Sequence, residues 1–166
     1  MITKAISDQF SIRFATPNDI PIILQLIKEL AEYENLLHMV VADEKLLDEW
    51  LFQKKVVEVI IGEMNNTVVG FSLFFYNFST FLGKPGIYIE DVYVKKEYRH
   101  QGYGKGFFRF IAQLARERGC GRMEWSVLDW NEPAIGFYQS LGASPLNEWT
   151  VYRLTSEGIQ NLAESK

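Results

Sequence analysis

A segment with three glycines and several basic residues occupies the expected start of a helix, at residues 97–110 (EYRHQGYGKGFFRF). An apolar run precedes it and an amphipathic helical pattern follows it. Glycine lowers helix stability, so the presence of three glycines at a helix start, Gly102, Gly104 and Gly106, requires an explanation. Glycine lets backbone N–H groups approach an oxyanion, and a helix N-terminus favours negative charge. The segment therefore predicts a phosphate-binding turn between a strand and a helix; a turn that needs only positive φ is the alternative.

Two common nucleotide-binding loops do not fit this segment. The chain holds no G-x-x-x-x-G-K-[ST] string, which a P-loop needs. A dinucleotide-binding loop needs G-x-G-x-x-G, but counting from Gly102 the third glycine position holds Phe107. The phosphate therefore has to belong to another kind of ligand.

The hydrophobic pattern predicts one central sheet with helices around it. Thr16, Pro17 and Asp19 have the order of a helix N-cap, a first-turn proline and a capping acid. Apolar and alternating runs predict strands at 11–15, 56–64, 67–76, 86–94, 122–128 and 148–154. Helical spacing predicts helices at 16–34, 43–52, 105–119 and 131–142, with a helical tail at 156–166. With no repeat or linker, we expect a single domain over residues 1–166, of the α+β or mixed α/β class.

The composition narrows the class of protein further. A formal net charge of −4 over 166 residues argues against nucleic-acid binding and mildly favours small cationic partners. No apolar run is long enough for a signal peptide or a membrane span. Cys120 is the only cysteine, and His38 and His100 lack metal-ligand spacing. We expect a cytoplasmic protein that binds no metal, no nucleic acid and no membrane.

Four segments together resemble one enzyme family. The string R-x-x-G-x-G at Arg99–Gly104 is joined by YIEDVYV upstream, WNEPAIGFYQSLGA downstream and LIKELAEYE near the start. In this combination and order they resemble the GNAT superfamily of acyl-CoA N-acyltransferases, in its spermidine/spermine and thialysine acetyltransferase branch. The resemblance covers residues 11–154 and implies a central mixed, largely antiparallel, twisted sheet flanked by helices.

The resemblance implies acetyl-CoA as the acetyl donor. It places the pyrophosphate of coenzyme A on the loop residues Arg99, His100, Gln101, Gly102, Tyr103, Gly104 and Lys105. It places the pantetheine arm along the backbone of Val92, Tyr93 and Val94, and it places the cofactor beside Asn131, Glu132, Pro133 and Ala134. His100 departs from the family pattern, which has glycine there, and Gly106 lies outside the motif.

Glu90 and Asp91 are carboxylates in the middle of an apolar strand. Neighbouring strand residues point to opposite faces, so we expect the two side chains on different faces of the sheet. Burial would raise the pKa of Glu90 towards the range of a useful base, whereas a structural pair with a core tyrosine or arginine is the alternative. The resemblance implies that Glu90 orients the acceptor amine and takes its proton, through water.

Tyr138 lies on an apolar helix face, where a tyrosine is usually part of the core. The resemblance implies a second role, as the acid that protonates the departing thiolate. A phenol with a pKa near ~10 can donate to a thiolate whose conjugate acid has a pKa near ~8.5. The N–H of Val92 would polarise the thioester carbonyl in the same reaction.

The acceptor side is predicted from the resemblance. Tyr33 and Glu34, which the sequence alone would place at an exposed helix end, are implied to line an acidic, aromatic channel with Glu90 and Asp91. The resemblance adds Glu124, Trp125 and Ser126 on the next strand, where the charge of Glu124 is a departure.

We therefore expect an N-acetyltransferase that acts by direct attack of a primary amine in a ternary complex. Polyamines, diamines and thialysine-like amino acids are the acceptors that the resemblance implies. Another amine, such as a peptide N-terminus or an aminoglycoside, is the first alternative, and a non-catalytic acyl-CoA-binding module is the second. A homodimer is also expected, because it is common among similar proteins.

Overall fold

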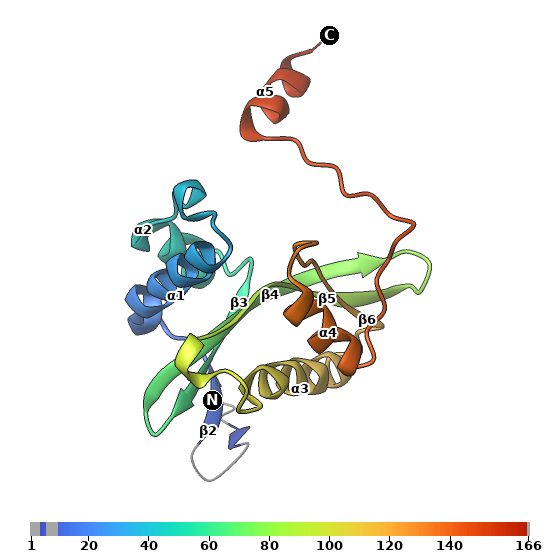
Figure 1. The fold of residues 1–166 in the computed structure, drawn as a ribbon. Coiled ribbons are helices and arrows are strands. Elements are labelled where there is room, and N and C mark those ends of the chain that lie inside the picture. The colour runs from blue at the N-terminus through green and yellow to red at the C-terminus, as the bar shows by residue number, and fades with distance from the viewer. Residues whose placement is uncertain (1–3, 6–9, 166) are drawn as a thin grey trace. The chain divides into compact units, whose positions relative to one another are not determined.

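A computed structural model of the chain describes residues 4, 5 and 10–165 (Figure 1). It divides into two compact units, residues 1–126 and residues 127–166, which are described in turn. The expectation that residues 1–166 form a single domain stays a prediction.

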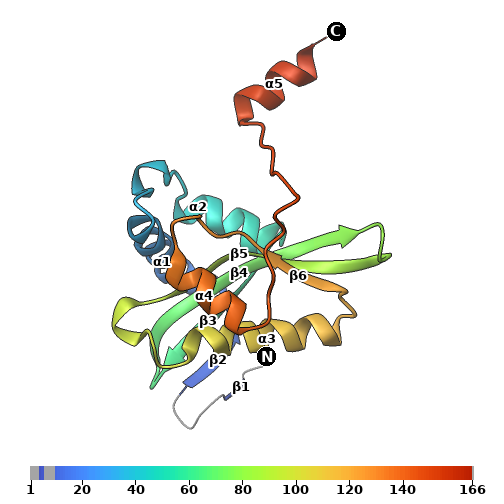
Figure 2. The ribbon, with the colours of Figure 1, turned by 45° about the vertical axis from the view of Figure 1, so that its right-hand side comes forward.

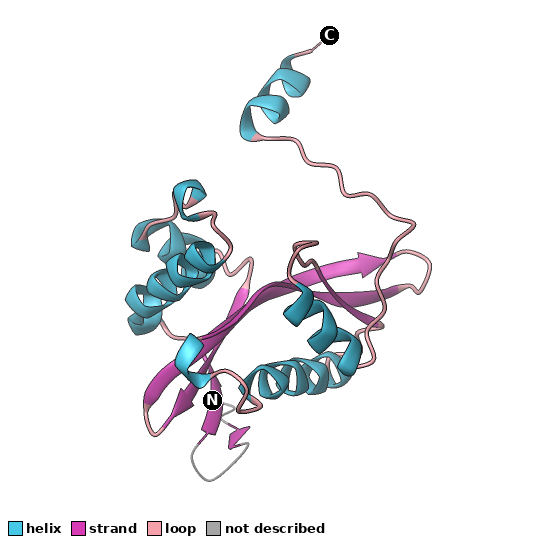
Figure 3. Cartoon of the chain, in the orientation of Figure 1, coloured by secondary structure: helices cyan, strands magenta, loops and turns pink. Residues whose placement is uncertain are grey.

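The first unit is built on a six-stranded sheet whose strands lie side by side in chain order. They are β1 (Lys4–Ala5), β2 (Phe10–Phe14), β3 (Glu58–Met64), β4 (Thr67–Ser79), β5 (Lys84–Val94) and β6 (Arg122–Trp125). Neighbouring strands are antiparallel, except that β5 and β6 run parallel. The sheet is thus mixed and largely antiparallel, which confirms the predicted fold class (Figure 3).

Helices cover both faces of this sheet. They are α1 (Ile20–Tyr33), α2 (Glu44–Leu47), which runs on into a π-helical turn at Asp48–Gln53, and α3 (Tyr103–Glu117). Short 3-10 turns lie at Pro17–Asp19, Leu37–Met39 and Lys96–Tyr98. Figure 2 shows α1 and α2 on one face of the sheet and α3 on the other.

The alternation of side chains along the strands builds the two halves of the core. Val59 and Ile61 join the buried cluster formed with α1 and α2. Gly62 lies on the other face, where a Cβ would come within 2.7 Å of the Phe107 ring of α3. Phe10 also packs edge-on against Phe107, with 6.4 Å between ring centroids. Alternate side chains along each strand therefore pack against α1 and α2 on one face of the sheet and against α3 on the other.

Charged groups fix the entrance to α1. The Asp19 carboxylate accepts two hydrogen bonds of 2.8 Å from the Arg13 guanidinium and one of 2.7 Å from the Thr16 N–H. The bonds from Arg13 are the main reason why the pKa of Asp19 falls to about 2. The predicted capping role of Asp19 is confirmed, although a 3-10 turn at Pro17–Asp19 precedes the α-helix.

The second unit contains α4 (Glu132–Ser140) and α5 (Ser156–Glu164). The predicted strand at 148–154 is wrong, because the structure assigns these residues no strand. Their β-forming side chains, including Trp149 and Val151, are exposed instead. A local pattern favours an extended backbone, but a strand also needs hydrogen bonds from a neighbour, which lies outside the pattern.

Candidate active site

The start of α3 leaves backbone N–H groups available to a ligand. Gly102 precedes the helix with φ of 86°, and a Cβ there would meet nothing within 4 Å. The left-handed backbone, and not crowding, is therefore what favours glycine at this position. The first hydrogen bond of the helix joins the Gly106 N–H to the Gly102 carbonyl at 3.0 Å, so the N–H groups of residues 103–105 precede the bonded turns. These groups, at the positive end of the helix dipole, suit an anion.

His100 has a φ of 62°, which is also left-handed. A glycine would adopt this backbone without strain, so the glycine of the family pattern has a physical reason at this position. His100 therefore differs from the family's glycine in its side chain but has the left-handed backbone that suits glycine.

Side chains of the loop anchor it to the sheet. The Tyr103 ring stacks on Phe10 of β2, with 4.3 Å between ring centroids, and its hydroxyl donates to the Met64 sulfur at 3.4 Å. Gln101 donates to the Glu97 carbonyl at 3.3 Å. The loop is thereby held at the end of the β2–β3 pair, and the predicted contacts with coenzyme A stay predictions.

The second half of β5 has a strand on one side only. β6 pairs with Gly86–Ile89, so among the described residues β4 alone pairs with Asp91–Val94. The Lys95 N–H donates to the Val69 carbonyl of β4 at 2.9 Å. Alternate residues of a strand direct their N–H groups to opposite sides, so those of Val92 and Val94 point away from β4. These groups can pair with an extended ligand lying along the strand.

A β-bulge interrupts β5 at Glu90. Leu73 of β4 lies opposite Asp91 and Phe74 lies opposite Ile89, so Glu90 has no partner in the register. Just past the bulge, the buried Ser72 donates from its hydroxyl to the Asp91 carbonyl at 2.7 Å. The bulge breaks the regular alternation on which we based opposite faces for Glu90 and Asp91. The placement of these two side chains on opposite faces stays a prediction, whereas the expected burial of Glu90 is wrong, since Glu90 is exposed and Asp91 is the half-buried carboxylate.

The charges of Glu34, at the end of α1, and of Glu90, at the bulge, both act on Asp91, and we call these three carboxylates the acidic cluster. Burial first, and then the charges of Glu90 and Glu34, raise the pKa of Asp91 to about 6. Burial also raises the pKa of Glu34. A partly buried carboxylate beside other negative charges is stabilised when it gains a proton or when a cation binds next to it. The cluster can therefore bind an ammonium group and exchange a proton near neutral pH.

Arg99 connects the end of α1 to β5. Its guanidinium carbon lies 4.5 Å from the ring centroid of Tyr33 and 5.5 Å from that of Tyr93. Its Nε donates to the Val94 carbonyl at 2.9 Å. The side chain that was assigned to the cofactor on the resemblance therefore contacts a predicted acceptor residue, Tyr33, and stacking holds that ring near β5.

The predicted acceptor residues Glu124 and Trp125 of β6, and Ser126 just after this strand, have structural partners. Glu124 accepts from the Asn77 amide at 2.7 Å and pairs with Arg122 at 3.0 Å. The Ser126 hydroxyl is 2.7 Å from that of Tyr88, and the Trp125 ring packs edge-on against Phe108. These contacts account for the three side chains without a ligand, so their role at the acceptor stays a prediction.

The second unit carries the remaining predicted residues on α4. The Asn131 side chain caps the helix by accepting from the Ala134 N–H at 3.3 Å, and Pro133 lies in the first turn. Tyr138 lies further along the helix beside Phe137, with 5.5 Å between ring centroids. The helix start was placed correctly from the sequence, and the chemical role of Tyr138 is a prediction.

The structure adds two contributions that the sequence did not show. Ser72 fixes the strand beside the bulge, and its only signal was a polar residue inside an apolar run. Tyr93 was predicted to act through its backbone, whereas its ring also contacts Arg99.

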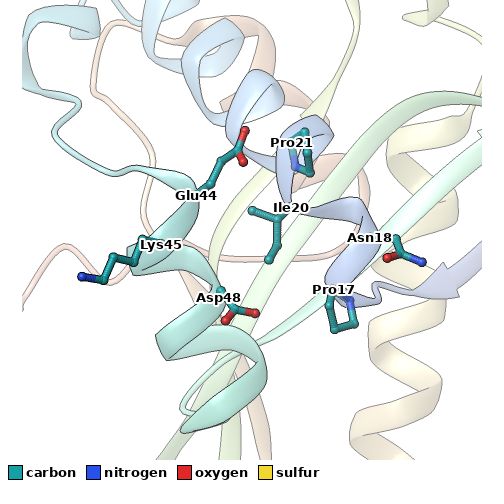
Figure 4. A pocket seen from close by; sticks show the side chains of 7 residues that line it. All are labelled: Pro17, Asn18, Ile20, Pro21, Glu44, Lys45 and Asp48. Carbon is teal, nitrogen blue, oxygen red and sulfur yellow. The ribbon is translucent and has the colours of Figure 1, made fainter.

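Two surface hollows lie outside this site. One, at the start of α1 and α2, is lined by Pro17, Asn18, Ile20, Pro21, Glu44, Lys45 and Asp48 (Figure 4). The other lies along α1 and includes Leu24, Lys28 and Glu32. Neither contains a candidate site residue.

Among residues 4, 5 and 10–165, no three His, Cys, Asp or Glu side chains gather in a way that could hold a metal ion. In the same part of the chain, no helix combines the length and the apolar character needed to cross a membrane.

Comparison with known proteins points to one family. The model of the acetyltransferase (GNAT) family matches residues 23–143. The chain is 37% identical to the thialysine N-epsilon-acetyltransferase of Bos taurus, over 92% of this chain and 96% of the relative. It is 33% identical to an L-ornithine N5-acetyltransferase of Arabidopsis thaliana, over 90% of this chain and 86% of the relative. An integron cassette protein from the mobile metagenome of V. cholerae has a similar structure, with a TM-score of 0.80 at 25% identity, over 96% of this chain and all of that one.

Proposed function

The chain belongs to the acetyltransferase (GNAT) family, and we propose that it transfers the acetyl group of acetyl-CoA to a primary amine of a small cationic acceptor. The acidic cluster of Glu34, Glu90 and Asp91 is the observation that carries the acceptor class. The negative charges that Glu34 and Glu90 exert on Asp91 disfavour a neutral or anionic acceptor and attract an ammonium group.

Diamines, polyamines and thialysine-like amino acids are the acceptors we propose. Each carries an ammonium besides the amine that reacts, and the second charge can remain beside the cluster. The names of two relatives, for thialysine and for L-ornithine, agree with small amine acceptors. Tyr33, held against Arg99, offers an aromatic face to the same cation.

The proposed reaction has two proton transfers. Acetyl-CoA supplies an activated acetyl group and a thiolate leaving group. The carboxylates at the bulge, Glu90 and Asp91, take the proton that the ammonium must lose before its nitrogen can attack. The Val92 N–H, which points away from β4, hydrogen-bonds the carbonyl oxygen as negative charge develops on it. The Tyr138 hydroxyl gives a proton to the thiolate.

The donor side rests on the backbone groups at two places. The N–H groups of residues 103–105, at the start of α3, would hold the pyrophosphate, because anions are favoured at a helix N-terminus. The N–H groups of Val92 and Val94, on the side of β5 where no described strand pairs with them, would pair with the pantetheine arm. Both sets of donors are backbone groups, so the departure at His100 leaves them intact.

A panel of amines tests the proposal. Thiol release from acetyl-CoA is measured with spermidine, thialysine, ornithine, an aminoglycoside and a peptide N-terminus. Release with the first three supports the proposed acceptor class, and release only with the last two favours the other amines. If acetyl-CoA binds while no amine gives release, the chain acts as an acyl-CoA-binding module and the enzymatic proposal fails.

We also propose a cytoplasmic homodimer. Acetyl-CoA is available inside cells, and a chain with one cysteine has no intramolecular disulfide to maintain. Cell fractionation and a measurement of molecular mass test these two statements.

A further inference from the structure

Arg99 begins the loop that we propose for the pyrophosphate, but its side chain contacts the acceptor side. Its guanidinium carbon is 4.5 Å from the ring centroid of Tyr33, the last residue of α1, and its Nε donates to the Val94 carbonyl at 2.9 Å. A guanidinium is planar, so it can lie against a ring while its edge donates a hydrogen bond. The loop, the end of β5 and the end of α1 are therefore joined by one side chain.

Tyr93 and Glu29 support Arg99 from the sheet and from α1. The Tyr93 ring is 8% exposed, and its centroid lies 5.5 Å from the Arg99 guanidinium carbon. The Tyr93 hydroxyl interacts with both Glu29 and Arg99; burial raises its pKa and the charge of Glu29 raises it further, whereas Arg99 lowers it. Gln25 donates to the Glu29 carboxylate at 2.8 Å, so Glu29 is itself held in place. The guanidinium thus lies among groups that restrict its movement.

Tyr33 occupies a position where such support matters. Its side chain is 38% exposed at the end of a helix, and helix ends fray. An exposed side chain of this kind loses rotational freedom when a ligand binds to it, and that loss weakens binding. A ring that is already held by Arg99 loses less freedom, so the acceptor binds more tightly.

We propose that Arg99 is a positioning residue for the acceptor, because its guanidinium holds the Tyr33 ring in the orientation that receives the cation. This rests on the proposed function, in which Tyr33 lines the acceptor site. It also gives the Arg99 side chain a task other than binding the pyrophosphate. The donors proposed for the pyrophosphate are backbone N–H groups of residues 103–105, so the guanidinium is not needed there.

The Arg99→Lys variant separates positioning from simple charge. Lysine keeps a positive charge beside the loop, but it has no plane that can lie on the Tyr33 ring while donating to the Val94 carbonyl. An electrostatic role toward the pyrophosphate would survive this substitution. A role in holding the Tyr33 ring would not.

Calorimetry measures the binding of each ligand to the full chain without turnover. The dissociation constant of acetyl-CoA is measured first, and then that of an amine with CoA bound. The amine is the one that gives the fastest thiol release, or 1,4-diaminobutane if none gives release. Arg99→Lys should weaken amine binding by about threefold to tenfold and change the acetyl-CoA constant by less than about twofold. Arg109→Lys, at an exposed position of α3, is the matched control and should change neither constant.

A double-mutant cycle tests whether the effect passes through Tyr33. Tyr33→Leu removes the ring and should weaken amine binding by itself. In that background Arg99→Lys should have no further effect on the amine constant. A general loosening of the loop would instead weaken binding equally in both backgrounds, and it would weaken acetyl-CoA binding as well.

The outcomes separate this proposal from the proposed function. The positioning role is overturned if Arg99→Lys binds the amine as tightly as the wild type, weakens both ligands alike, or has the same effect with and without the Tyr33 ring. A wild type that binds no amine overturns it too. If the amine binds and depends on Arg99 as expected while no thiol is released, the proposed function fails and the positioning role stands.

Discussion

Replacing Asp91 with asparagine should stabilise the fold at neutral pH while impairing the reaction. The surroundings of Asp91 raise its pKa from the ordinary value of 3.8 to about 6. Each pKa unit corresponds to ~1.36 kcal/mol, so ionising Asp91 costs the folded state up to about 3 kcal/mol more than it costs the unfolded chain. Asparagine has nearly the same shape and does not ionise, which removes this cost.

The sign of the effect depends on pH. The folded state holds the proton of Asp91 more tightly than the unfolded state, so the stability of the wild type falls as pH rises from 3.8 through about 6. Above pH 7 the variant should therefore exceed the wild type by up to about 3 kcal/mol in free energy of unfolding. The gap should narrow to about half of this at pH 5 and vanish below pH 3.8.

Urea unfolding of both proteins at pH 5 and pH 8 measures this gap. Glu32→Gln is the matched control, because Glu32 is exposed in the last turn of α1, two residues before Glu34, and is not among the charges that shift the pKa of Asp91. The control should show no pH-dependent gap. If the Asp91→Asn protein is no more stable than the wild type at pH 8, or is stabilised equally at both pH values, then ionisation of Asp91 does not destabilise the folded state and the reasoning is refuted.

Four further outcomes are expected. The pH profile of kcat/KM should fall on the acid side with an apparent pKa of about 6, and Asp91→Asn should remove that limb; a limb that persists assigns it to another group. Tyr138→Phe should lower kcat by ~10²–10⁴-fold with little change in acetyl-CoA affinity measured by calorimetry; unchanged turnover would exclude Tyr138 as the acid. Gly102→Ala should cost ~1–2 kcal/mol of stability and weaken acetyl-CoA binding, because alanine disfavours a φ of 86°; wild-type affinity would contradict this. Asp19→Asn should lower stability at pH 7, and the loss should fade as pH falls from 3.8 through about 2, because the pKa of Asp19 is depressed; a loss that is equal at low pH would contradict the ion pair.

Local sequence signals predicted most of the first unit. The start of α1 was predicted from Thr16 and Asp19. The Asp19 carboxylate accepts hydrogen bonds from the backbone N–H and from the hydroxyl of Thr16. The loop before α3 was recognised because only glycine adopts the backbone at Gly102 without strain. The strand pattern of residues 86–94 likewise predicted β5, which extends two residues further toward the hairpin.

What the sequence did not show depends on pairing between distant segments. The bulge at Glu90 exists only in the register between β4 and β5, where the spacing of two strands differs by one residue. Hence the faces and burial of Glu90 and Asp91 could not be predicted from alternation. The strand expected at 148–154 failed for the same reason, since a β-forming composition does not supply a neighbouring strand.

The most direct test of the proposed acceptor class is kcat/KM for acetyl transfer to two amines that differ by one charge, 1,4-diaminobutane and 1-aminobutane. The acidic cluster predicts that the wild type prefers the diamine by about tenfold or more, equivalent to ~1.4 kcal/mol. It predicts that Glu34→Gln reduces this preference, while Glu32→Gln preserves it. Equal kcat/KM values for the two amines in the wild type, or no acetyl transfer to either, would contradict the account.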